Sequence, residues 1–275
     1  MKKSSLVVFA ALAFWTLAHP QASEARISLF FPWMFQERPA TQTHALDQSV
    51  GFQTGWSGVS PAGGSNDSTH ILFPYEITYG VMKQLEVGAG WGLQYLDRKN
   101  QSDQFGIIDL QLAAKYRLFD ADRVKRMPGL DVEMGFSFPT ASFEKGLGTG
   151  AFGILFGWGM VLPLDPLRMH AGMGFRLNTE NSDDVRLGHV FSYNVGASLP
   201  IKQVHKDFAA IGELKGFNHG KSKFRGNAVG SASDELYLAP GASFNLPHNL
   251  RMLGQLLIGL TGDSSDAGFS FELQF

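Results

Sequence analysis

A repeated alternation of apolar and polar residues limits the folds that this chain can adopt. It is clearest at 85–95, where residues such as Leu85, Val87, Trp91 and Tyr95 alternate with glycine or polar residues. Successive side chains of a β-strand point to opposite faces, so a period of two predicts a strand with one apolar face.

The chain also ends on such a segment, in which Phe269, Phe271, Leu273 and Phe275 share one face. A β-sandwich could contain one segment of this kind, but here the pattern recurs with turn-rich stretches between the repeats. We count twelve segments, at 49–57, 71–81, 85–95, 107–118, 130–139, 152–162, 167–178, 190–199, 208–216, 235–245, 250–260 and 269–275. Most have the length that a tilted strand needs to cross a bilayer. We therefore predict an all-β fold, a transmembrane antiparallel up-and-down β-barrel of about twelve strands.

The amino-terminal residues predict export. Lys2 and Lys3 precede an apolar run at 6–17, and small residues near Ala25 form the pattern that signal peptidase reads. We expect a cleaved signal peptide at 1–25, a periplasmic segment at 26–48 and the barrel at 49–275. The periplasmic segment contains an aromatic cluster from Phe30 to Phe35. A plug, a tether and a packing segment at the barrel base are all open interpretations of it.

The connections between the predicted strands alternate between short and long, as in outer-membrane barrels. One connection, at 119–129, is long where a short one is expected. An even number of strands places both termini on the periplasmic side of the outer membrane. The last strand should then pair with the first, 49–57, which leaves no unpaired strand edge.

Several segments resemble a known family. Residues 72–81 read LFPYEITYGV, residues 85–91 read LEVGAGW, and residues 109–118 have the pattern D-x-x-L-x-x-K-Y-R-L. With the Phe-Pro-Thr at 138–140 and the terminal aromatic strand, they resemble a family of outer-membrane transporters labelled meta-pathway of phenol degradation. The resemblance implies a barrel that passes small, often apolar or aromatic, compounds, and it implies no catalytic residues.

Strand parity also predicts which charged residues face the barrel lumen. A charge that faced lipid near the bilayer midplane would cost roughly 2–4 kcal/mol, so these side chains should turn inward. The candidates are Glu76, Glu86, Asp109, Lys115, Arg117, Asp131, Glu133, Arg168, His170, Arg176, Glu213, Lys215, Arg251 and Glu272. They fit either the lining of a water-filled channel or a salt-bridged core that fills a narrow barrel.

The sequence gives little sign of chemistry beyond transport. The chain has no cysteine and no calcium-loop or zinc-ligand spacing, so we expect no metal and no cofactor. The glycines at 148–153 have the spacing of a dinucleotide fingerprint, but they lead into a strand rather than a helix. No serine and histidine stand in an arrangement that indicates hydrolysis, and enzymatic activity is not expected.

The expected partners are those of an outer-membrane barrel. They are membrane lipid, lipopolysaccharide, a small-molecule solute, and the barrel-assembly machinery, which would recognise the terminal strand through Phe275. Lipopolysaccharide phosphates could contact the basic stretch at 217–225. A formal net charge of −2 gives no indication of nucleic-acid binding. We predict a passive channel or transporter; the alternative is a structural, adhesive or assembly barrel with a filled lumen.

Overall fold

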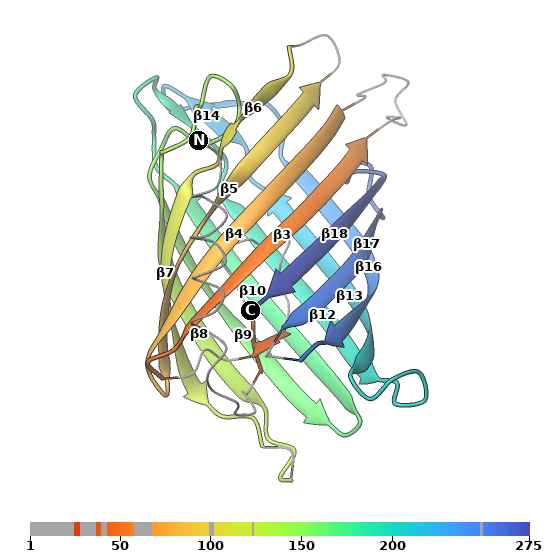
Figure 1. Ribbon diagram of the computed structural model, residues 1–275. Helices are drawn as coiled ribbons and strands as arrows, with labels where there is room; N and C mark the ends of the chain where they lie inside the picture. Colours follow the sequence, from red (N-terminus) through yellow and green to blue (C-terminus); the bar gives the residue numbers. More distant parts are fainter. Residues whose placement is uncertain are drawn as a thin grey trace, which may run out of the picture.

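The chain forms a closed barrel of tilted antiparallel strands (Figure 1). The computed structural model describes residues 25–27, 37–39, 43–57, 68–98, 102–122, 124–247 and 250–275. Within these ranges, twelve strands form the wall: β3 (Leu46–Ser57), β4 (Ser68–Met82), β5 (Leu85–Arg98), β7 (Leu110–Phe119), β8 (Gly129–Phe138), β9 (Gly153–Leu164), β10 (Leu167–Asn178), β12 (Val190–Pro200), β13 (Phe208–His219), β16 (Ser233–Asn245), β17 (Arg251–Gly259) and β18 (Ala267–Gln274). The predicted all-β barrel of twelve strands is confirmed.

The last strand closes the barrel by pairing with the first. The segment Ala267–Gln274 of β18 lies antiparallel to Ser49–Trp56 of β3. Beyond this ladder, the backbone groups of Gln48 and Phe275 exchange two hydrogen bonds of 2.8 and 2.9 Å. The predicted pairing of the terminal strand with the first strand is therefore confirmed, and it hides the edges of both strands.

The two ends of the barrel differ. At one end, which we call the turn end, several connections are tight, such as Lys83–Gln84 and Asp165–Pro166. The connection at 120–128 lies at this end and is longer. At the opposite loop end, β11 (Val185–Arg186), β14 (Ser222–Phe224) and β15 (Asn227–Val229) form a small sheet that joins two loops.

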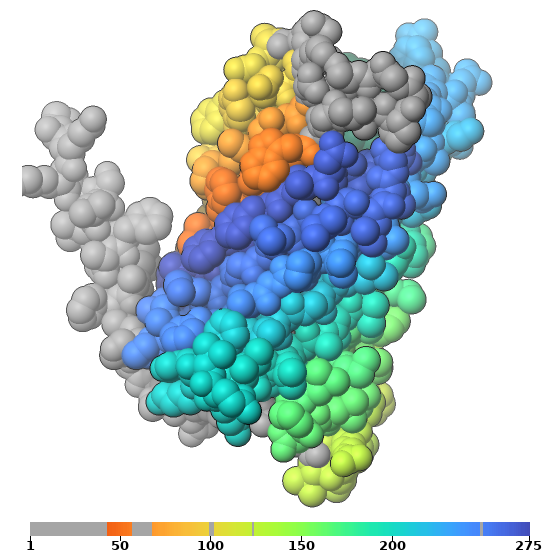
Figure 2. Space-filling view, turned by 90° about the vertical axis from the view of Figure 1, so that its right-hand side faces the viewer, coloured from red at the N-terminus to blue at the C-terminus, as the bar shows by residue number. Residues whose placement is uncertain are grey.

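Alternation along the strands sends apolar side chains outward and polar ones inward. In β5, Trp91 is 38% exposed and Leu93 is 42% exposed, whereas Glu86 is only 6% exposed. Figure 2 shows the neighbouring strands as tilted bands that cover one face of the barrel. Aromatic rings of neighbouring strands lie side by side on the outer face. The ring centroid of Phe175 in β10 lies 5.7 Å from that of Phe156 in β9 and 4.9 Å from that of Phe191 in β12. This inside-out distribution suits a wall that faces lipid.

The fourth predicted strand, 107–118, is interrupted in the structure. Its first residue belongs to β6 (Gln104–Ile107), which pairs with β5 at 93–96, near the loop end. The rest of it from residue 110 onward belongs to β7. Between the pairs Leu93–Ile107 and Gly90–Gln111, β5 contributes two residues and the opposing segment contributes three. One extra residue on one side of an antiparallel pair is a β-bulge.

The bulge changes the direction of two neighbouring side chains. Ile108 and Asp109 are 9% and 4% exposed, so both turn inward although they are adjacent in the chain. The Ile108 backbone N–H donates to the carbonyl of Gly92 across the interruption at 3.0 Å. Strict alternation across the predicted strand 107–118 would place Ile108 on the apolar outer face together with Leu110 and Leu112. That expectation is wrong for Ile108, because alternation fails where a residue is inserted.

The amino-terminal region is described in part. β1 (Ala25–Ile27) pairs with β2 (Glu37–Pro39), and β1 lies against β9. The predicted signal peptide up to residue 24 and the aromatic cluster at 30–35 lie outside the described residues. No helix among the described residues is long and apolar enough to span a membrane.

A charge placed on the outer face should destabilise the barrel. Leu256 of β17 is 56% exposed and faces outward. We expect Leu256→Arg to reduce the free energy of unfolding by about 2–4 kcal/mol, because a lipid-facing arginine loses hydration. Urea unfolding in lipid vesicles measures this change. Val204→Arg, at a 67% exposed position in a turn-end loop, is the control. Equal stability of the two variants would contradict a lipid-facing position for Leu256.

Candidate functional site

The charged residues that the sequence assigned to the lumen occupy inward-facing positions of the wall. Three of them, Arg168, Arg176 and Arg251, are partly exposed. The buried ones are Glu76, Glu86, Asp109, Lys115, Arg117, Asp131, Glu133, His170, Glu213, Lys215 and Glu272. They do not form one site. Most lie in the half of the barrel nearer the turn end, whereas Asp109, Glu133, Arg176 and Lys215 line a cavity nearer the loop end.

At the turn end, opposite charges meet directly across neighbouring strands. Lys115 of β7 lies 3.6 Å from Glu86 of β5, and the Arg117 Nε atom lies 3.0 Å from a carboxylate oxygen of Asp131 in β8. Each pair also occupies opposite positions in the strand register. Their side chains are nearly all buried, so mutual pairing compensates the loss of hydration.

A second buried cluster joins strands on the other side of the barrel. Glu213 accepts from Lys215 at 3.0 Å and from the Nε2 atom of Gln255 at 2.5 Å, and its other oxygen lies 2.5 Å from His170. Lys215 also donates to the Gln255 side-chain oxygen at 2.9 Å. These four residues, which we call the Glu213 cluster, come from β10, β13 and β17. Because Lys215 also lines the cavity, the cluster forms part of its floor.

Asp109, which the bulge turns inward, holds the loop at 140–152 by hydrogen bonds inside the barrel. One carboxylate oxygen accepts from the backbone N–H and the hydroxyl of Thr149, both at 2.8 Å, and the other accepts from the Ala141 N–H at 3.2 Å. Gly148 passes so close that an added Cβ would collide with this carboxylate. The loop at 140–152 is thus held against the wall, and its residues 146–149 line the cavity.

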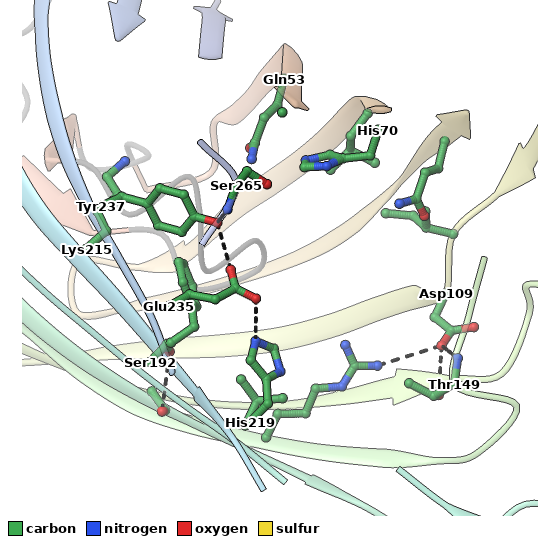
Figure 3. A pocket seen from close by; sticks show the side chains of 18 of the residues that line it. Gln53, His70, Asp109, Thr149, Ser192, Lys215, His219, Glu235, Tyr237 and Ser265 are labelled. Carbon is green, nitrogen blue, oxygen red and sulfur yellow. Dashed lines mark hydrogen bonds and ion pairs between the residues drawn. The ribbon is translucent and has the colours of Figure 1, made fainter. Parts of the chain in front are cut away.

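The cavity occupies the loop-end part of the lumen and has a volume of about 650 Å³. Its apolar lining includes Leu72, Ile108, Leu147, Phe217 and Leu257, all of them buried. Its polar lining comes from glutamines, serines, histidines and carboxylates (Figure 3). Groups of histidine, aspartate or glutamate arranged to hold a metal do not occur within the described residues.

Glu235 of β16 stands at the centre of the polar side of this cavity. One carboxylate oxygen accepts from the Tyr237 hydroxyl at 2.8 Å, and the other lies 3.4 Å from the His219 Nε2 atom. The backbone N–H of Ser265 donates to the same Tyr237 hydroxyl at 3.0 Å. Figure 3 shows the carboxylate between the tyrosine and the histidine. The Glu235 side chain is 28% exposed, so it remains accessible from the cavity.

Comparison with solved structures identifies the architecture. The barrel resembles the crystal structure of an outer membrane channel from Pseudomonas putida F1, with a TM-score of 0.69 and 15% sequence identity over 86% of this chain and 95% of that chain. The chain has the fold of an outer-membrane β-barrel. The translocator domain of the autotransporter NalP from Neisseria meningitidis gives a TM-score of 0.49 at 12% identity, over 98% of this chain and 96% of that one.

No protein-family model matches the chain, and no curated protein matches it. The resemblance to the family labelled for phenol degradation therefore stays a prediction.

Sequence reasoning missed several residues of the cavity. His70 and His219 lie outside the predicted strands 71–81 and 208–216, but they belong to β4 and β13, which extend beyond these bounds. Glu235 was included in a predicted strand but not among the lumen candidates. Extending the alternation by a few residues finds His70 and His219, and parity within 235–245 finds Glu235, because each continues the inward-facing series of its strand.

Breaking the Glu213 cluster should destabilise the barrel strongly. Lys215→Met leaves Glu213 buried without its lysine, and removing one partner of a buried pair costs about 3–5 kcal/mol. We expect a loss of this size in the free energy of unfolding, measured with urea in lipid vesicles. The exposed Lys202→Met is the matched control and should be nearly neutral. A loss below about 1 kcal/mol for Lys215→Met would show that the pair is not buried in the way described.

Proposed function

We propose that this protein is a passive channel of the outer membrane for small solutes that carry an apolar or aromatic part. The cavity within the lumen carries the proposal, because about 650 Å³ is a volume typical of small-molecule sites. Its lining is mixed, with apolar side chains from several strands and polar groups that stay accessible. The protein of similar fold from Pseudomonas putida F1 is named an outer membrane channel, which supports the same function here.

The proposed orientation follows from the outer surface and the connections. The apolar outer face lies against lipid, the loop end faces the outside of the cell, and the turn end faces the periplasm. Both termini then lie in the periplasm, with Phe275 at the end of β18 available to the assembly machinery. A solute from outside would enter the cavity from the loop end.

Two elements restrict the route through the barrel. The loop at 140–152 is fastened by Asp109 and narrows the cavity from the side. The Glu213 cluster lies at the cavity floor and occupies part of the lumen beneath it. Passage of a solute requires room beside these elements or their displacement, so we propose a narrow and selective channel rather than a wide pore.

A barrel without transport function is the second candidate. The buried ion pairs at the turn end favour it, because Lys115, Glu86, Arg117 and Asp131 fill space in the lumen. A structural or adhesive barrel would need no passage beyond the cavity. The two candidates differ in whether solutes pass through the lumen from one end of the barrel to the other.

Electrical recording distinguishes the candidates. We expect the purified full-length protein to produce discrete single-channel currents in a planar bilayer, and its liposomes to admit small aromatic solutes faster than protein-free liposomes. A channel must do both, because solutes and ions share one lumen. Absence of current together with absence of solute entry would overturn the channel function and favour the filled barrel.

Releasing the loop at 140–152 should widen the route. Asp109→Ala removes three hydrogen-bond acceptor contacts of that loop, and we expect the single-channel conductance to rise several-fold as the loop leaves the wall. Asp103→Ala, which removes an exposed acid bonded to Tyr95, is the control for the lost charge. Unchanged conductance in Asp109→Ala would mean that this loop does not restrict the channel.

A further inference from the structure

We infer that the cavity binds solutes that carry a protonated amine on an apolar body, with the amine directed to Glu235. The inference rests on the proposed channel function, because it names the class of solute that the same cavity takes. Three features of the cavity carry it: a carboxylate that lacks a lysine or arginine partner, unpartnered acceptor oxygens, and an apolar wall.

Glu235 is the first feature. Its carboxylate accepts from the Tyr237 hydroxyl at 2.8 Å and lies 3.4 Å from the Nε2 atom of His219. Within the described part of the chain, no lysine or arginine lies within ion-pair distance of it. A partly exposed carboxylate of this kind attracts a cation, and a charge-assisted hydrogen bond from an ammonium group is stronger than one between neutral groups.

Unpartnered acceptors are the second feature, and they are independent of the carboxylate. Gln53 and Gln111 line the cavity and are 8% and 5% exposed. Among the described residues, neither side-chain oxygen accepts a hydrogen bond. A buried acceptor without a donor is costly, so these oxygens favour water or a solute that brings N–H or O–H donors. An ammonium group brings three donors and no acceptor.

The apolar wall is the third feature and receives the rest of the solute. Leu72, Phe217 and Leu257 are each less than 10% exposed and line the same cavity. Ile108, which the bulge turns inward, adds to this wall. Contact with these side chains removes apolar solute surface from water, which stabilises binding. The cavity thus accommodates an amine and an apolar body together.

The remaining charges of the cavity disfavour an anion. Among the described lining residues, four are acids and two are lysine or arginine. Lys215 is paired with Glu213 at 3.0 Å. Arg176 donates to Ser137 at 2.9 Å and to Asn178 at 3.1 Å, and it lies 3.7 Å from Asp109. Acids therefore outnumber lysine and arginine in the lining, and an excess of negative charge in a cleft favours cations over anions.

Three fluorescent probes of similar size test the inference. They are 1-naphthylmethylammonium, the neutral 1-naphthalenemethanol and the anion 1-naphthoate, each titrated by fluorescence anisotropy into the full-length protein in amphipol at pH 8. At this pH an ordinary histidine carries no charge. We expect the ammonium probe to bind about ten-fold more tightly than the anion and more tightly than the alcohol.

Variants assign the preference to Glu235. Glu235→Gln keeps the shape and removes the charge, so it should weaken binding of the ammonium probe about ten-fold and leave the alcohol nearly unchanged. Asp183→Asn, an exposed acid outside the cavity lining, removes the same charge and should change affinity by less than about two-fold.

Two results would overturn the inference. One is binding of naphthoate or naphthalenemethanol that equals or exceeds binding of the ammonium probe. The other is a Glu235→Gln variant that retains the affinity for the ammonium probe. The channel function is judged separately by current and solute entry. A protein that conducts without this preference would therefore overturn only the assignment of the amine.

Discussion

The pairing of β18 with β3 is the constraint on which the rest of this structure depends. A lipid bilayer offers no water to hydrogen-bond exposed backbone groups, so a spanning sheet must close on itself. The ladder between Ala267–Gln274 and Ser49–Trp56 achieves closure, and the bonds between Gln48 and Phe275 extend it to the last residue. Without this pairing, the backbone groups along one edge of each strand would have no partner in the wall.

Closure also determines the distribution of side chains. Every strand then has one face toward the surroundings and one toward a confined lumen, and the outward face is apolar. Charges that turn inward leave bulk water and must find partners. Direct cross-strand pairs such as Lys115–Glu86, and the larger cluster around Glu213, meet this requirement. The same pairs therefore stabilise the wall and restrict the lumen.

The irregular part of the wall shapes the cavity. Regular alternation would place Ile108 and Asp109 on opposite faces, but the bulge between β6 and β7 turns both inward. Ile108 becomes part of the apolar lining. Asp109 holds the loop at 140–152 through hydrogen bonds from Thr149 and Ala141. A local departure from strand geometry thus places two lining residues of the cavity, which agrees with the frequent occurrence of bulges near functional sites.

The sequence by itself determined the twelve strands and the inward direction of residues such as Glu76 and Lys215. It could do so because alternation is a local property, readable from neighbouring residues. Only the tertiary structure decided that Glu213 meets His170 and Gln255, and that Glu235 and His219 share a cavity with Asp109. These contacts join strands far apart in the chain. Their geometry depends on closure, register and one inserted residue, none of which a local pattern records.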